Sequence, residues 1–280
     1  MGLLMLIEFT KMHGLGNDFV VIDAIRQDIS LTAEQIQFIA GRHFGVGCDQ
    51  LLLVELAPHS DADFRYRIFN ADGSEVAQCG NGARCFARFV RDKELSSKDN
   101  ILVDTHAGQL LLSFAEDDLI SVNMGIPQHE PALIPLSTEQ EETLYTLHIG
   151  NEGKSFGAVS MGNPHAVIQV ADVQQAAVEE LGAALESHAF FPQKANIGFM
   201  QVIDKNNIKL RVYERGAGET LACGSGACAA VVIGIEQQIL ANDVLVELPG
   251  GSLKIHWHGR GHPVFMTGPA VSVFEGSIEL

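Results

Sequence analysis

The sequence predicts an α+β fold built from two copies of one unit, each rich in β-strands and each containing one long buried helix. Three observations lead to this prediction. A Cys-Gly-x-Gly stretch occurs at 79–82 and again at 223–226. Short runs of β-branched and aromatic residues, which favour strands, surround both stretches. Five landmarks recur in the same order at a spacing of about 145 residues, which indicates an internal duplication.

The length, charge and cysteine content of the chain limit what it can be. With 280 residues, 46% of them hydrophobic, it is long enough for two domains with cores of their own. Its net charge of −17 argues against nucleic acid or an anionic membrane as a partner, because both require a basic surface. The apolar start lacks the basic residues of a signal peptide, and no apolar run is long enough to span a bilayer. Five cysteines, an odd number, fit a reducing cytoplasm better than a disulfide framework.

The first half of the chain contains the elements of one unit. Strands are expected where β-branched and aromatic residues cluster, at 9–13, 19–22, 51–54, 66–69, 101–103 and 109–112. Residues 31–40 have helical spacing, and Thr32 with Gln35 three positions later predicts a capping box. A second helix is expected after Cys79, because apolar residues follow it at i, i+3, i+4 and i+7, namely Ala83, Phe86, Ala87 and Val90.

The second half repeats these elements in the same order. The matching pairs of segments are 16–22 with 162–168, 50–53 with 196–199, 79–82 with 223–226, 101–104 with 244–247, and 124–125 with 267–268. We therefore expect a first domain at 1–124 and a second at 125–269, with the last strand, 270–280, returning to the first domain. An additional amphipathic surface helix is expected at 174–188.

The repeated cysteines, Cys79 and Cys223, are the candidates for chemistry. A cysteine at a helix start lies where the helix dipole favours a thiolate. Two such thiols lining the joint between two related domains can invert a carbon centre without a cofactor, because one removes a proton from one face and the other returns a proton to the opposite face. The helix N-termini would hold a substrate carboxylate and developing charge. This mechanism requires one thiolate and one thiol, and we expect His165 and Glu214 to set that difference.

The other cysteines and the glycine-rich turns allow different interpretations. Cys48, Cys85 and Cys228 are expected to be structural. The Cys79/Cys85 spacing is wider than that of structural zinc sites, and no pair of histidines lies beside either cysteine loop, so we expect no metal, while a redox role for the cysteine pair stays open. The glycines at 14–16 lack the third glycine and the following helix of a dinucleotide site.

Six motifs closely resemble the diaminopimelate epimerase family, and the similarity runs nearly end to end. They lie at 13–19, 70–75, 79–84, 161–165, 213–216 and 219–226. The resemblance implies two pseudo-symmetric domains, each a barrel-like sheet wrapped around a central helix, and a homodimer. It also implies a cofactor-independent enzyme, free of pyridoxal phosphate, that interconverts L,L- and meso-diaminopimelate for lysine and peptidoglycan synthesis. A proline-type racemase of the same fold is the near alternative, and a redox or metal-binding protein is the alternative from another class.

The resemblance also implies roles for individual residues. Cys79 and Cys223 match the acid/base pair, and His165 and Glu214 match residues thought to tune it. The positions that match donors at the helix starts are Gly80, Asn81, Gly224 and Ser225. The positions that match the substrate-binding set are Asn17, Gln50, Asn70, Asn163, Asn196, Glu214 and Arg215. Such a set suits diaminopimelate, whose two amino-acid ends need both donors and acceptors. Phe274, in the last strand, matches an aromatic residue of the dimer contact.

Overall fold

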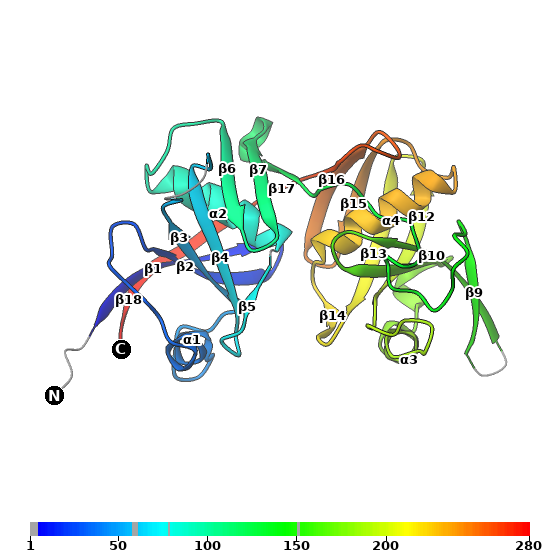
Figure 1. Ribbon diagram of the computed structural model, residues 1–280, viewed down its shortest axis with the longest axis horizontal. Helices are drawn as coiled ribbons and strands as arrows, with labels where there is room; N and C mark the ends of the chain where they lie inside the picture. Colours follow the sequence, from blue (N-terminus) through cyan, green and yellow to red (C-terminus); the bar gives the residue numbers. More distant parts are fainter. Residues whose placement is uncertain (1–4, 58–60, 78, 150–151) are drawn as a thin grey trace. The chain divides into compact units, whose positions relative to one another are not determined.

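The computed structural model describes residues 5–57, 61–77, 79–149 and 152–280. The chain forms two compact units, shown in Figure 1: unit 1 comprises Met1–Val122 and Gly268–Leu280, and unit 2 comprises Asn123–Thr267. Each unit is a strand-rich α+β fold with one long central helix, which confirms the predicted fold class. In the part of the chain that the structure describes, no helix is both long and apolar enough to cross a membrane.

Unit 1 is a curved sheet whose strands pair in the order β18-β1-β2-β3-β4-β6-β7-β8, with β5 beside β4. Its strands are β1 (Leu6–Gly14), β2 (Asn17–Asp23), β3 (Gln50–Glu55), β4 (Phe64–Asn70), β5 (Glu75–Val76), β6 (Asn100–Thr105), β7 (Gly108–Phe114), β8 (Ile120–Asn123) and β18 (Val271–Glu279). A short 3-10 helix, η1 (Glu116–Asp118), precedes β8. The pairs β2–β3 and β4–β6 are parallel, and the others are antiparallel. The C-terminal strand β18 pairs with β1, so the chain ends in the unit in which it begins.

Two helices cover this sheet. The central helix α2 (Gly80–Asp92) contacts β1, β2, β3, β7 and β18, and its predicted apolar face is buried. The shorter α1 (Ala33–Ala40) buries Ile36 and Ile39 against the sheet. Both hydrogen bonds of the capping box between Thr32 and Gln35 are present, as predicted.

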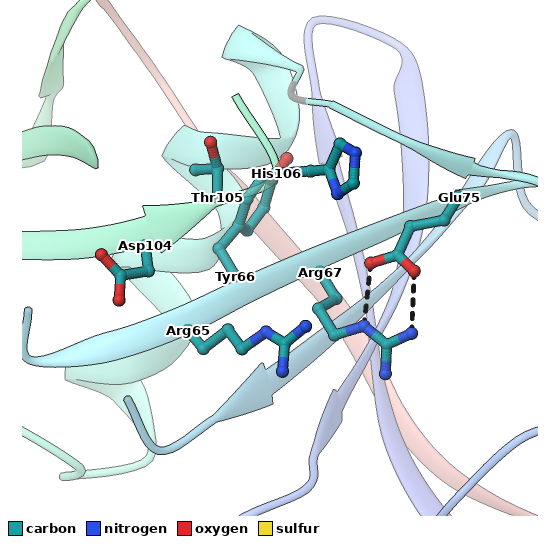
Figure 2. Close-up of a pocket in the computed structure, with 7 residues that line it drawn as sticks. All are labelled: Arg65, Tyr66, Arg67, Glu75, Asp104, Thr105 and His106. Atoms are coloured by element: carbon teal, nitrogen blue, oxygen red, sulfur yellow. Dashed lines mark hydrogen bonds and ion pairs between the residues drawn. The ribbon is translucent and has the colours of Figure 1, made fainter. Parts of the chain in front are cut away.

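A polar pocket lies beside β4 and the turn between β6 and β7 (Figure 2). Its lining consists of Arg65, Tyr66, Arg67, Glu75, Asp104, Thr105 and His106. Arg67 donates two hydrogen bonds of 2.8 Å to the Glu75 carboxylate, so its charge is compensated inside the pocket wall. The lining contains none of the site residues expected from the sequence.

Unit 2 repeats the topology of unit 1, with the strand order β9-β10-β11-β12-β13-β15-β16-β17 and β14 beside β13. Its strands are β9 (Tyr145–Ile149), β10 (Glu152–Ser160), β11 (Pro164–Gln169), β12 (Asn196–Asp204), β13 (Asn207–Glu214), β14 (Gly218–Thr220), β15 (Asp243–Leu248), β16 (Gly251–Trp257) and β17 (Val264–Gly268). The central helix α4 (Gly224–Glu236) contacts β10, β11, β12, β13 and β16.

The repeat extends to the register of individual residues. In unit 1, Phe19 of β2 lies opposite Gln50 of β3 in a parallel pair. In unit 2, His165 of β11 lies opposite Asn196 of β12, again in a parallel pair. The two halves of the sequence therefore build the same local scaffold around different side chains.

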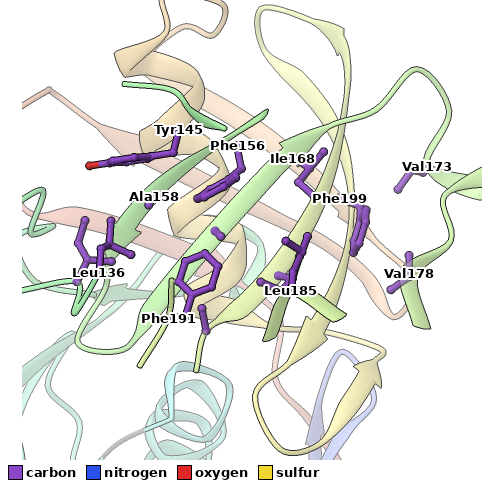
Figure 3. Packing of buried hydrophobic residues seen from close by; sticks show 14 residues of the cluster. Leu136, Tyr145, Phe156, Ala158, Ile168, Val173, Val178, Leu185, Phe191 and Phe199 are labelled. Carbon is purple, nitrogen blue, oxygen red and sulfur yellow. The ribbon is translucent and has the colours of Figure 1, made fainter. Parts of the chain in front are cut away.

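The surface helix of unit 2 differs from its prediction. The sequence predicts one helix over 174–188, whereas the structure has a 3-10 turn, η2 (Val173–Gln175), and then α3 (Val178–Glu186). The Asp172 side chain accepts the Gln174 N–H and caps η2, which ends before α3 begins. Val178 and Leu185 of α3 pack with aromatic residues of the sheet, including Phe156, in the cluster shown in Figure 3.

Candidate active site

Cys79 occupies the N-cap position of α2, as its place before the glycine-rich turn predicts. Its backbone is extended, with φ −142° and ψ 121°. Its carbonyl oxygen accepts the first helical hydrogen bond, from the Ala83 N–H at 2.8 Å, and a second one from the Tyr66 hydroxyl at 3.2 Å. The thiol lies 3.7 Å from Oδ1 of Asn17. Cys79 is therefore held at the helix start, with its sulfur beside an amide.

A network of amides fixes the surroundings of this sulfur. Oδ1 of Asn17 also accepts a hydrogen bond of 3.3 Å from Nδ2 of Asn81. Nδ2 of Asn17 donates to Asp49, and Oδ1 of Asn81 accepts from the fully buried Arg84, each at 3.0 Å. Because both amides are bonded at both ends, their oxygen and nitrogen atoms cannot exchange places without losing these bonds.

Unit 2 has an equivalent arrangement around Cys223, the N-cap residue of α4. The Cys223 carbonyl accepts from the Ala227 N–H at 3.0 Å, and its sulfur lies 3.7 Å from the Ser225 hydroxyl. Nδ2 of Asn163 donates to that hydroxyl at 3.4 Å. Asn163 and Ser225 thus stand where Asn17 and Asn81 stand in unit 1.

The protonation of Cys223 follows from its environment. Burial raises the pKa of the Cys223 thiol well above its ordinary value, and the negative charge of Glu214 together with a hydrogen bond to it raises this pKa further. Hydrogen bonds from Ser225 and the Gly226 backbone oppose the shift only in part. Glu214 in turn accepts a hydrogen bond from the Thr220 hydroxyl. Cys223 is consequently a neutral thiol near pH 7.

His165 contributes geometry rather than charge. Its side chain is buried, and burial, followed by the positive charge of Arg215, lowers its pKa to about 3. The neutral ring is hydrogen-bonded through Nε2 to Oδ1 of Asn163 at 3.0 Å. His165 therefore reaches the cysteine through a chain of contacts, from His165 to Asn163 to Ser225 to Cys223.

The remaining polar residues of the predicted substrate set form pairs within each unit. In unit 1, Nε2 of Gln50 donates to Oδ1 of Asn70 at 3.0 Å. In unit 2, the buried Asn196 donates to the Pro164 carbonyl and accepts the Arg215 N–H at 2.9 Å. These contacts tie the Arg215 backbone, just after the end of β13, to the start of β12.

Three predicted positions remain, of which Gly80 joins the first network by accepting a hydrogen bond of 3.5 Å from Nη1 of Arg84 at its carbonyl. Gly80 and Gly224 are the first residues of α2 and α4, and the first N–H groups of a helix have no partner within the helix, which suits an anion. Phe274 lies on β18, is 49% exposed, and packs edge-on against Phe9.

Sequence reasoning missed three residues that support the site. Asp49 holds Asn17, Arg84 holds Asn81, and Thr220 holds Glu214. The one available signal was for Arg84, since a charged residue within the buried face of α2 requires polar partners. Asp49 is distant in sequence from Cys79, so no local pattern connects it to the site. Thr220 lies within the 219–226 motif, three residues before Cys223, but its contact with Glu214 depends on the pairing of β13 with β14.

Comparison with known proteins identifies the family. A sequence model described as diaminopimelate epimerase matches residues 9–130 and 157–273, which include both cysteine loops. The chain belongs to the diaminopimelate epimerase family.

Solved structures with the same fold come from several related groups. A phenazine biosynthesis protein of the PhzF family from Bacillus anthracis has a TM-score of 0.69 at 18% identity, covering 98% of this chain and 99% of its own. A hydroxyproline epimerase from Agrobacterium vitis has a TM-score of 0.71 at 13% identity, with 98% and 93% covered. A probable proline racemase from Agrobacterium radiobacter has a TM-score of 0.69 at 14% identity, with 96% and 92% covered. The family and two of these three structural relatives are named as isomerases.

Proposed function

We propose that this protein is a cofactor-independent epimerase that interconverts L,L- and meso-diaminopimelate, with Cys79 and Cys223 as its two acid/base groups. One observation carries the proposal: each cysteine is the N-cap of a central helix, and each sulfur lies 3.7 Å from a polar side chain. Each of these polar side chains in turn accepts a hydrogen bond from an asparagine. Two equivalent thiols match a reaction in which each face of one α-carbon needs its own acid or base.

The environment of Cys223 supports a division of roles at rest. A thiol whose pKa is raised by burial and by Glu214 is suited to donate a proton. In the forward reaction, Cys79 removes the α-proton as a thiolate, and Cys223 then delivers its own proton to the opposite face. After turnover the roles are exchanged, so the reverse reaction follows the same path with the cysteines in each other's place.

The polar residues are proposed to bind the substrate. The N–H groups at the starts of α2 and α4, near Gly80 and Gly224, suit the α-carboxylate and the charge that develops on it during proton removal. Glu214 and Arg215 supply opposite charges, which suits the distal ammonium and carboxylate of a substrate with two amino-acid ends. The remaining members of the set are Asn17, Gln50, Asn70, Asn81, Asn163, Asn196 and Ser225.

Deuterium exchange tests this mechanism. Wild-type protein in D₂O should incorporate deuterium at the α-carbon of diaminopimelate while it epimerises the substrate. Cys79→Ala and Cys223→Ala should each abolish epimerisation, because either change leaves one face without its acid/base group. Cys85→Ala and Cys228→Ala change cysteines buried in the same two helices and should retain activity. Near-normal turnover in either Cys79→Ala or Cys223→Ala would refute the two-base mechanism.

The same assay distinguishes the alternatives. A proline-type racemase, which the fold relatives make a specific competitor, would exchange the α-proton of L-proline or hydroxyproline and leave diaminopimelate unchanged. A redox protein would exchange disulfides with a dithiol through Cys79 and Cys223 and show no α-deuterium uptake from any of these amino acids.

We also propose that the protein is a cytoplasmic homodimer that associates through β18. Val271, Val273 and Phe274 on this strand are 43%, 55% and 49% exposed, and neighbouring exposed apolar residues often mark an interface. Light scattering during size-exclusion chromatography should give twice the chain mass of 30.2 kDa for the wild type and a smaller mass for Phe274→Glu. Phe44→Glu is the control and should remain a dimer, because Phe44 is 90% exposed but lies in the loop that follows α1. A monomeric wild type would refute this assembly.

A further inference from the structure

Three histidines lie together at the end of β16 in unit 2, and the proposed epimerase mechanism uses none of them. Nε2 of His256 lies 3.0 Å from Nε2 of His258. Their rings are nearly perpendicular, at 89°, with centroids 4.3 Å apart. The ring of His262 lies next to that of His258, at 5.9 Å between centroids.

The core of unit 2 holds the first two histidines in place. Trp257, between them, is fully buried, and its Nε1 donates to the His262 carbonyl at 2.9 Å. Because successive residues of an extended chain point to opposite faces, burial of Trp257 turns His256 and His258 to the same outer face. The pair is thus a consequence of how β16 packs.

A carboxylate orients one of the two rings. Asp243 of β15 lies directly opposite His256, and its Oδ1 is 2.7 Å from Nδ1 of His256. A neutral ring that donates its Nδ1–H to a carboxylate turns its Nε2 lone pair outward, where it accepts a hydrogen bond from Nε2 of His258 that a metal ion would replace. This is the arrangement that supports metal-binding histidines in many proteins.

We propose that His256 and His258 bind one divalent transition-metal ion of the kind that prefers imidazole, such as Ni²⁺ or Zn²⁺. Two nitrogens that each lie about 2.1 Å from one ion are about 3.0 to 3.4 Å apart for bond angles between octahedral and tetrahedral. The observed separation of 3.0 Å falls in this range. Among the residues that the structure describes, no three His, Cys, Asp or Glu side chains are grouped to hold an ion, so water completes the coordination and the metal is exchangeable.

Titration of Ni²⁺ into protein without a histidine tag tests the site by calorimetry. Wild-type protein should bind one equivalent through this pair, and His256→Asn and His258→Asn should each weaken that binding at least tenfold. His262→Asn changes a neighbouring histidine on the same turn and should bind like the wild type. The proposal is overturned if wild type binds no Ni²⁺, if binding survives both His256→Asn and His258→Asn, or if it depends on His262 as strongly as on His256.

The orienting role of Asp243 is tested in the same titration. Asp243→Ala removes the acceptor for Nδ1 and should weaken Ni²⁺ binding about tenfold. Asp243→Asn keeps an oxygen that accepts the same hydrogen bond and should restore part of the affinity. Equal affinity in Asp243→Ala and wild type would show that Asp243 does not orient the site.

Discussion

The neutral, buried His165 makes a prediction about stability as a function of pH. The pKa of its side chain is about 3 in the folded protein and about 6.5 in the unfolded chain. Between these values the unfolded chain binds a proton that the folded protein does not bind. Protonation therefore favours unfolding, and the stability of unit 2 must fall as the pH decreases below about 6.5.

The size of this effect follows from the two pKa values. A pH of 5 lies about 1.5 units below the pKa of the histidine in the unfolded chain. Protonation of the unfolded chain therefore lowers the free energy of unfolding by roughly 2 kcal/mol relative to pH 8. His165→Gln removes this titration, while the glutamine amide can still donate to Oδ1 of Asn163. The loss of stability between pH 8 and pH 5 should be smaller in His165→Gln than in wild type by roughly the same 2 kcal/mol.

Urea unfolding at the two pH values measures this difference. Trp257 is the one tryptophan of the chain and is buried in unit 2, so its fluorescence reports on the unit that contains His165. His148→Gln, at an exposed histidine of the same unit, is the control and should leave the wild-type pH dependence intact. If His165→Gln has the same pH dependence as wild type, His165 is not held neutral by burial and the account of its role fails.

Two further predictions concern packing and charge. Gly157→Ala in β10 would place a Cβ 2.3 Å from the Cγ2 of Ile233 and should lower the free energy of unfolding by about 1–3 kcal/mol. Gly153→Ala in the same strand, where the nearest atom lies 3.7 Å from the new Cβ, should have a much smaller effect. Urea unfolding measures both variants, and equal losses of stability would contradict the packing argument. Glu214→Gln removes the negative charge that helps to raise the pKa of Cys223. Alkylation of Cys223 by iodoacetamide at pH 8, measured by mass spectrometry, should therefore be several-fold faster than in wild type. An unchanged rate would show that burial alone sets this pKa.

Much of the fold could be predicted from the sequence because its signals are local. The apolar spacing after Cys79 and the pair of Thr32 and Gln35 depend only on residues a few positions apart, and both predictions are confirmed. The helix predicted at 174–188 was wrong at its start, since its apolar spacing continues through a segment that Asp172 caps as a separate 3-10 turn. Periodicity detects which face of a segment is buried, but it does not detect where the backbone changes from one helix type to another.

The site could be predicted less completely, because the state of its residues depends on burial and on distant contacts. The place of each cysteine follows from its glycine-rich turn, yet the neutral state of His165 follows from its burial within the unit. The contact between Glu214 and Cys223 arises because β13 ends beside the start of α4, which no spacing in the sequence reveals. The support of Asn81 by the buried Arg84 is likewise visible only once α2 is packed.

The duplication explains why the two cysteines are placed alike and why they need not behave alike. Two identical environments would give both thiols the same tendency to ionise, whereas proton exchange across one carbon requires one thiolate and one thiol. The positions at the ends of β4 and β13 differ in charge: Asn70 is a neutral amide bonded to Gln50, and Glu214 is a carboxylate that raises the pKa of Cys223. The scaffold that the repeat conserves therefore fixes where the sulfurs lie. The side chains that the repeat does not conserve raise the pKa of Cys223, and among them Glu214 has the largest effect after burial itself.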